Sequence, residues 1–93
     1  MRRVRDVRRM KVEVRVYPKE GVLDPQGRAI ASALERLGHR SVEDVRAGKI
    51  FFLDVRGDDP AVVEAEARRM AEELLANPVI EGYDVRLETD RER

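Results

Sequence analysis

The sequence contains no cysteine and only one histidine in its 93 residues. Without cysteine the chain has no disulfides, no thiolate zinc or iron–sulfur sites and no thiolate nucleophile. The histidine, His39, directly follows Gly38, where a helix is expected to end. We interpret it as a solvated loop residue, because neither a general base nor a metal ligand is expected there without partner groups.

Nucleotide-binding loops are also missing, because the six glycines never occur as G-x-G-x-x-G or G-x-x-x-x-G-K-[ST]. The carboxylate pairs Asp58-Asp59 and Glu72-Glu73 consist of adjacent residues, which point to different faces of a helix. Capping of a helix N-terminus explains the first pair. We therefore expect no catalytic, cofactor-binding or metal-binding residues in this chain.

Net charge and long apolar runs are absent as well. Nineteen basic and 19 acidic side chains cancel, so no overall field attracts nucleic acid or an anionic membrane. No apolar run is long enough to span a bilayer, and no secretory signal is recognisable. The sequence predicts a cytoplasmic protein.

The length predicts a single domain with a two-layer core. We assign an Arg-rich N-terminal extension to residues 1–9, the folded domain to 10–88 and a polar C-terminal tail to 89–93. The extension has no apolar face that continues into the next segment, so we interpret it as an appendage.

Alternation of apolar and charged residues predicts strands with one buried face at residues 10–18, 49–56 and 83–88. A further strand near residues 42–46 is predicted to form a hairpin with 49–56. Ala47-Gly48, between two Val-rich runs, supplies the expected turn.

Two helices are predicted, each beginning at an Asp-Pro pair, Asp24-Pro25 and Asp59-Pro60, in which Asp caps free N–H groups and Pro fits the first turn. Gly38 ends the first and Asn77-Pro78 the second. The apolar stripes are Ala29, Ile30, Ala33, Leu34 and Leu37 in the first helix, and Val63, Ala67, Met70, Ala71 and Leu74 in the second.

The predicted order β-α-β-β-α-β indicates an α+β, ferredoxin-like fold. Its two layers would be a four-stranded antiparallel sheet and two helices on one face of that sheet. The other face would expose either Ile50 and Phe52, or Phe51, Leu53 and Val55. Because apolar side chains on an open face usually mark a partner surface, we expect an oligomer.

Two other functions are compatible with this order. RNA-recognition modules stack bases on aromatic residues of the open face, but this chain has only two Phe and two Tyr. A stand-alone regulatory module would bind a small ligand such as an amino acid or a nucleotide.

Three separated motifs narrow the choice: "GVLDPQG" at 21–27, "DVRAGK" at 44–49 and "LLANPVIEGYDV" at 74–85. In this order and spacing the sequence closely resembles PurS, the small subunit of phosphoribosylformylglycinamidine synthase. The resemblance covers about residues 10 to 88. It implies a role in de novo purine biosynthesis, in an assembly that converts formylglycinamide ribonucleotide (FGAR) to formylglycinamidine ribonucleotide (FGAM) with ATP and glutamine.

The resemblance further implies a division of labour. A glutaminase subunit, PurQ, releases ammonia, and a synthetase subunit, PurL, uses ATP and Mg²⁺. The PurS-like chain holds neither cofactor and is not expected to be active alone. It would bridge PurL and PurQ, assist ammonia transfer, and form a homodimer with sheets joined between subunits.

Residues of the matching motifs are our candidates for contacts with the partner enzymes: Asp24, Pro25, Gln26, Gly27, Arg46, Lys49, Asn77 and Pro78. Ile50 and Phe52 are the candidates for self-association. Each candidate also has a local explanation. Asn77-Pro78 ends a helix, the glycines permit a turn, and Arg46 and Lys49 are solvated charges beside a turn.

Overall fold

The computed structural model describes residues 8–88. Along this part of the chain the elements are β1 (Arg9–Pro18), α1 (Pro25–Arg36), β2 (Lys49–Arg56), α2 (Pro60–Met70), the π-helical turn η2 (Ala71–Leu75) and β3 (Glu81–Glu88). The three strands predicted around 10–18, 49–56 and 83–88, and both helices, are confirmed. The described part of the chain therefore has an α+β fold.

The strands form one antiparallel sheet in the order β2-β1-β3. β1 lies in the centre, and Val14 stands opposite Phe51 of β2 and Val85 of β3. β1 starts one residue before the predicted domain boundary, and Arg8 accepts a backbone hydrogen bond from Gly57 (2.9 Å). The division at residues 9 and 88 stays a prediction, because 1–7 and 89–93 lie outside the described residues.

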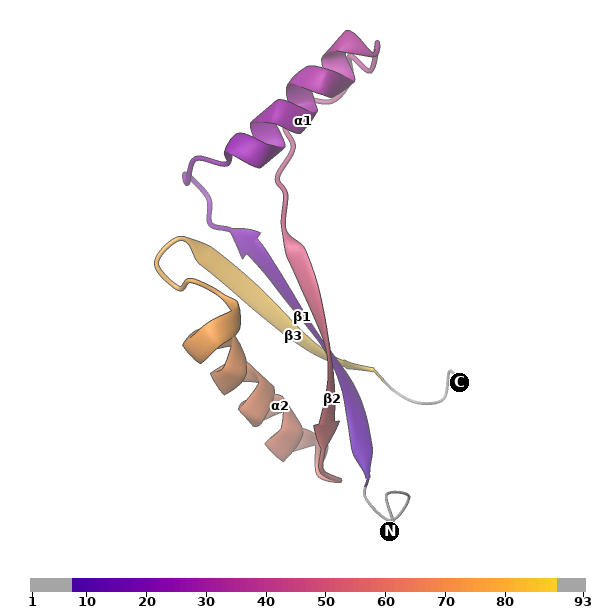
Figure 1. Cartoon of the computed structure of the whole chain (residues 1–93), viewed down its shortest axis with the longest axis vertical. Coiled ribbons are helices and arrows are strands. Elements are labelled where there is room, and N and C mark those ends of the chain that lie inside the picture. Colours follow the sequence, from indigo (N-terminus) through magenta and orange to yellow (C-terminus); the bar gives the residue numbers. More distant parts are fainter. Residues whose placement is uncertain (1–7, 89–93) are drawn as a thin grey trace.

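The core lies between β1 and α2. Val12, Val14 and Val16 point to one face of the sheet and are at most 2% exposed, as their alternation predicts. Val63, Ala67 and Ala71 of α2 and η2 are equally buried against them. α2 packs over β1 and β3 (Figure 1). Small alanines on its inner face let the helix approach the valine row closely.

The predicted placement of both helices on one face is wrong. Only α2 covers the sheet, whereas α1 extends beyond its end and makes no extensive contact with it (Figure 1). After α1 the chain runs back alongside the helix, and residues 42–48, the return segment, lead into β2. α1 and its return segment thus form an arm attached to one end of the sheet.

The predicted fourth strand and hairpin are also wrong: residues 8–88 form a three-stranded sheet, and residues 42–48 form neither a strand nor a helix. A two-residue hairpin needs positive φ at its turn, and Gly48 is not one of the glycines with positive φ. Instead Gly48 allows a close backbone approach, because a Cβ there would collide with the Val16 carbonyl oxygen.

The π-helical turn changes which residue at the end of α2 faces the core. The Ala76 N–H donates to the Ala71 carbonyl (2.9 Å), a bond that spans five residues. The extra residue in this turn brings Leu75 and Ala76 to the core and leaves Leu74 81% exposed. The prediction that Leu74 belongs to the buried stripe is therefore wrong, because it assumed an uninterrupted α-helical period.

This shift of one residue is testable by two leucine truncations. We expect Leu75→Ala to lower the free energy of unfolding by about 2 kcal/mol, because it removes methyl groups packed against the core. Leu74→Ala is the matched control and should change it by less than about 0.5 kcal/mol. Urea titrations at equal protein concentration measure both. Equal losses would contradict the π-helical register.

Candidate partner-docking site

The three sequence motifs meet at one end of the sheet, where β1 ends and β2 and β3 begin (Figure 1). A hollow of about 460 Å³ lies there, between the sheet and the base of α1. Its lining includes Tyr17, Leu23, Asp24, Gln26, Lys49 and Ile80. Residues far apart in the sequence therefore contribute to one surface.

Asp24 connects the two ends of the α1 arm. Its Oδ1 accepts a hydrogen bond from the Gly27 N–H (3.0 Å), which caps α1, and Pro25 occupies the first helical position. Its Oδ2 accepts from the Ala47 N–H (2.9 Å), just before β2. The hydrogen bond from Ala47, followed by that from Gly27, holds the pKa of Asp24 below its ordinary value.

Gly27 is buried where α1 meets the return segment. A Cβ at this position would collide with the Val45 carbonyl oxygen and would come within 2.6 Å of the Asp24 carboxylate. The glycine is therefore needed because the return segment crosses the first turn of α1 at very short range.

Arg46 links the second motif to the end of β1. One guanidinium nitrogen donates to the carbonyl oxygens of Pro18 (3.2 Å) and Lys19 (2.7 Å). The Lys19 Nζ in turn donates to the Pro78 carbonyl oxygen (2.7 Å) in the third motif. Arg46 is thus more than a solvated charge, because it fastens the base of the arm to the sheet.

Asn77 shapes the turn between η2 and β3. Its Oδ1 accepts from the Val79 N–H (3.1 Å), and its own N–H donates to the Glu81 carboxylate (2.8 Å). Pro78 follows it in this turn and is exposed. The expectation that Asn77-Pro78 ends the helix holds, and the turn itself displays Val79 at 78% exposure.

The structure separates the predicted contact residues into two groups. Asp24, Gly27, Arg46 and Asn77 hold the backbone in place through the contacts above. Pro25, Gln26, Lys49 and Pro78 are exposed, and no side-chain hydrogen bond among the described residues ties them to the backbone. Arg46 and Asn77 of the first group are exposed too, but their polar atoms bind backbone groups.

Sequence reasoning missed three residues at this end: Lys19, which joins two motifs, and the exposed Leu23 and Val79. Leu23 and Val79 could have been found from the sequence, because each is a large apolar residue inside a predicted turn, where it is expected to be exposed.

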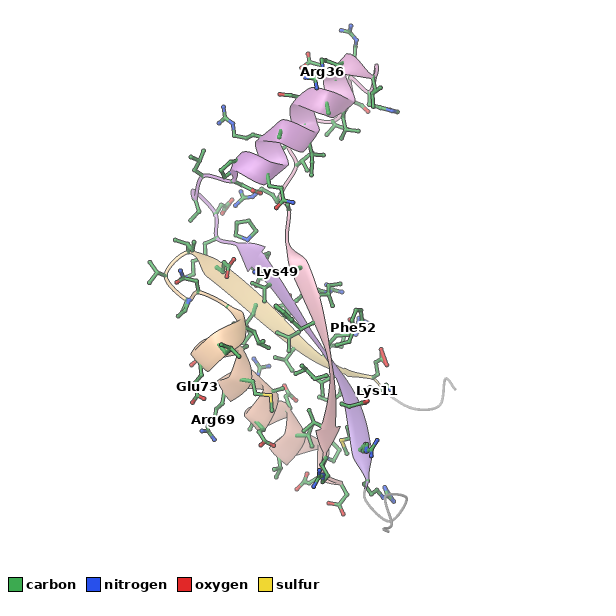
Figure 2. The ribbon with its side chains drawn as sticks, in the orientation of Figure 1. Lys11, Arg36, Lys49, Phe52, Arg69 and Glu73 are labelled. Atoms are coloured by element: carbon green, nitrogen blue, oxygen red, sulfur yellow. The ribbon has the colours of Figure 1, made fainter. Side chains whose placement is uncertain are left out.

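The open face of the sheet carries the predicted self-association pair. Ile50 is 47% and Phe52 is 72% exposed, whereas Phe51, Leu53 and Val55 face α2. Figure 2 shows Phe52 projecting from the sheet on the side away from α2. The remainder of this face is largely charged, with Lys11 and Asp54 paired across strands at 3.3 Å.

A metal-binding group of side chains is not found in residues 8–88. The described residues contain no cluster of three or more side chains suited to a metal ion. Within the same range, none of the helices has the length and apolar character needed to cross a membrane. The arrangement at the end of the sheet offers apolar side chains, an amide and an ammonium group, which suit binding.

Comparison with known proteins identifies the family. The family model described as "PurS: Phosphoribosylformylglycinamidine (FGAM) synthase" matches residues 11–89. The chain belongs to the PurS family. The PurS subunit of phosphoribosylformylglycinamidine synthase from Mycobacterium leprae is 47% identical over 76 residues, 82% of this chain and 92% of the relative. The PurS subunit from Bacillus subtilis is 44% identical over 78 residues, 84% and 92% respectively.

Solved PurS structures share the fold. The crystal structure of Methanocaldococcus jannaschii PurS has a TM-score of 0.77 and 36% identity, covering 87% of this chain and 98% of that one. A chain in the structure of PurLQS from Thermotoga maritima has a TM-score of 0.80 and 31% identity, with 87% and 99% coverage. The match therefore extends over nearly the whole length of each relative.

The close approach at Gly27 gives one prediction. Gly27→Ala should lower the free energy of unfolding by about 1–3 kcal/mol, because the Val45 backbone has to shift to admit the methyl group. Ser32→Ala, at an exposed position of the same helix, should be neutral within about 0.5 kcal/mol. Thermal unfolding followed by circular dichroism measures both. A stabilised Gly27→Ala variant would show that the two segments are not in contact.

The lowered pKa of Asp24 gives a prediction about acid stability. A carboxyl whose folded pKa lies below its unfolded pKa stabilises the fold above the unfolded value, and this contribution is lost as the pH falls through the folded pKa. Asp24→Asn should therefore be less stable at neutral pH and lose less stability below about pH 4 than the unmodified chain. Glu43→Gln, in the exposed return segment, is the control. The free energy of unfolding is measured as a function of pH for each variant. If it falls equally steeply below about pH 4 in the unmodified chain and in Asp24→Asn, the role given to Asp24 is contradicted.

Proposed function

We propose that this chain is the non-catalytic PurS subunit of phosphoribosylformylglycinamidine synthase and bridges the PurL synthetase and the PurQ glutaminase. One observation carries the proposal. The three motifs that identify the family converge on one end of the sheet, where they line one hollow. The similarity to a chain of the PurLQS structure supports placement in such an assembly.

The surface at this end suits a protein partner. Leu23 and Val79 are 69% and 78% exposed, and Gln26 beside them offers an uncharged amide. Covering apolar groups and an amide costs far less desolvation energy than covering an unpaired charge. The Asp24 and Arg46 side chains bind backbone groups at the base of the arm and so fix the backbone that displays this surface.

The chemistry then belongs to the partners. In the proposed assembly PurQ releases ammonia from glutamine, and PurL uses ATP and Mg²⁺ to convert FGAR to FGAM in the cytoplasm. The PurS chain contributes by holding the two enzymes in a fixed relative position, so that ammonia passes from PurQ to PurL. No step of the reaction is assigned to a side chain of this subunit.

Self-association is the second part of the proposal. Ile50 and Phe52 form an apolar pair on an otherwise charged open face, and such a patch is typical of a contact surface. We assign both residues to contacts within a PurS homodimer or a higher oligomer.

Reconstitution tests the bridging role. Alone, the chain should convert no FGAR. Added to PurL and PurQ, it should restore glutamine-dependent synthesis, whereas synthesis from ammonia by PurL should proceed without it. Steady-state assays with glutamine or ammonium as the nitrogen source measure the difference. Equal stimulation with both nitrogen sources, or activity of the chain alone, would overturn the proposal.

The contact assigned to the open face predicts a change in self-association. Phe52→Asp should weaken it by at least about tenfold, because the new carboxylate loses its hydration in the contact. Val62→Asp is the matched control, since Val62 is also exposed (59%) but lies on α2. Sedimentation velocity over a concentration series measures both variants. An unchanged oligomer for Phe52→Asp would remove Phe52 from the contact.

A further inference from the structure

The end of α2 exposes an apolar side chain that an uninterrupted α-helix would bury. Leu74 in η2 is 81% exposed, more than any other large apolar residue among residues 8–88. The π-helical turn leaves it outside the core and brings Leu75 and Ala76 into the core instead. Single π-helical turns are rare and occur frequently at functional sites. Leu74 is therefore a candidate for contact with another molecule.

The segment around Leu74 is acidic. Residues 70–81 contain no basic residue and three carboxylates, those of Glu72, Glu73 and Glu81. Glu81 belongs to β3, but its carboxylate accepts a hydrogen bond from the Asn77 N–H (2.8 Å), which places it at the end of η2. Figure 2 shows Glu73 projecting from this end of the helix, away from the sheet. The exposed leucine thus shares the helix end with three carboxylates.

These carboxylates are unfavourably placed for the helix itself. The carbonyl groups at a helix C-terminus carry partial negative charge, so basic side chains are favourable there and acidic ones are not. η2 has no basic residue in its last turn. Glu73 is paired with Arg69 at 3.5 Å, but no ion pair among the described residues includes Glu72 or Glu81. The negative charge of this helix end is thus largely uncompensated within residues 8–88.

The other polar contacts at this end fix the carboxylates without neutralising them. The Tyr83 hydroxyl donates to the Glu72 carboxylate (2.9 Å), and Glu81 accepts from a backbone N–H. The Lys19 ammonium group binds the Pro78 carbonyl oxygen (2.7 Å), not a carboxylate. Hydrogen bonds from neutral donors orient a carboxylate but leave its charge. Glu72 and Glu81 are therefore held in position as charged groups.

We propose that Leu74, Glu72, Glu73 and Glu81 form a contact surface, the Leu74 surface, for one of the two partner enzymes. Leu74 enters an apolar pocket of that enzyme, and Lys or Arg side chains at the rim of the pocket face the carboxylates. The leucine contributes apolar burial, and the carboxylates select a basic rim by charge complementarity. The proposal rests on the bridging role proposed above, and it adds a contact residue and the charge of the surface that receives it.

The charge of the Leu74 surface argues against other occupants. A two-fold contact between copies of this chain would place the same surface of both copies together, so that their carboxylates would repel one another. Nucleic acid and anionic lipid carry the same sign of charge as these carboxylates and would be repelled as well. A protein surface with basic groups around an apolar pocket is the occupant that satisfies both the leucine and the carboxylates.

Substitutions of Leu74 by charges of opposite sign test the surface. In a titration of the chain into PurL and PurQ, Leu74→Arg should raise the concentration needed for half-maximal glutamine-dependent synthesis at least about tenfold, because the added cation meets the basic rim. The free chain should remain folded, since an arginine at this helix end is favourable. Leu74→Glu should have a smaller effect than Leu74→Arg. Val62→Arg, at an exposed position of α2 (59%), is the matched control and should have no effect.

A second variant removes charge and keeps the hydrogen bonds. In the double variant Glu72→Gln, Glu81→Gln the amide oxygens still accept from the Tyr83 hydroxyl and the Asn77 N–H. We expect its affinity for the enzyme to fall about fivefold at low salt and to match that of the unmodified chain at roughly 0.5 M NaCl, because salt screens exposed charges. Interferometry on immobilised PurL and PurQ measures the affinities, and circular dichroism checks the fold.

Three results would overturn the Leu74 surface: an unchanged titration for Leu74→Arg, a larger loss for Leu74→Glu than for Leu74→Arg, or a loss of self-association in sedimentation velocity without a loss of enzyme binding. The outcomes are separable from those of the bridging role. If the unmodified chain restores glutamine-dependent synthesis and Leu74→Arg does so equally well, the proposed function stands and the Leu74 surface is lost. If the unmodified chain binds neither enzyme and restores no synthesis, the proposed function fails, and the Leu74 surface fails with it.

Discussion

The position of the α1 arm depends on one carboxylate with two backbone partners. Asp24 binds the Gly27 N–H with one oxygen and the Ala47 N–H, 23 residues away, with the other. A buried N–H without a partner costs about 1–3 kcal/mol, so neither bond is easily given up. Because both ends of the arm are tied at this point, α1 leaves the sheet in a fixed direction and residue 47 cannot turn into a hairpin. Arg46 reinforces the tie by binding the last carbonyl groups at the end of β1.

The polar side chains of the family motifs serve mainly to hold the backbone. Asp24, Arg46, Lys19 and Asn77 all direct polar atoms to backbone groups. What they produce is a fixed surface on which apolar side chains and an amide are exposed. The bridging role proposed above would need a rigid surface of this kind.

The sequence predicts the elements that depend on local patterns. The Val12, Val14 and Val16 alternation gives β1 and its buried face, and the Asp-Pro pairs give both helix starts, because caps and periodicity are short-range features. The turn at Ala47-Gly48 is not predictable in this way, since its conformation is set by Asp24, which lies far away in the sequence. The π-helical turn is missed for a related reason. The π-helical turn buries Leu75 and Ala76 and exposes Leu74. Helical periodicity does not predict this, because it assumes an uninterrupted α-helix.

The hairpin prediction fails because of a constraint at its turn. Closing the hairpin would break the Ala47 bond to Asp24 and would require positive φ in the turn. Arg46 adds to this constraint, because it binds the Pro18 and Lys19 carbonyl oxygens and so holds the residue before Ala47 at the end of the sheet. A carboxylate that lies 23 residues away in the sequence thus decides the path of the chain into β2, although the local pattern favours a turn.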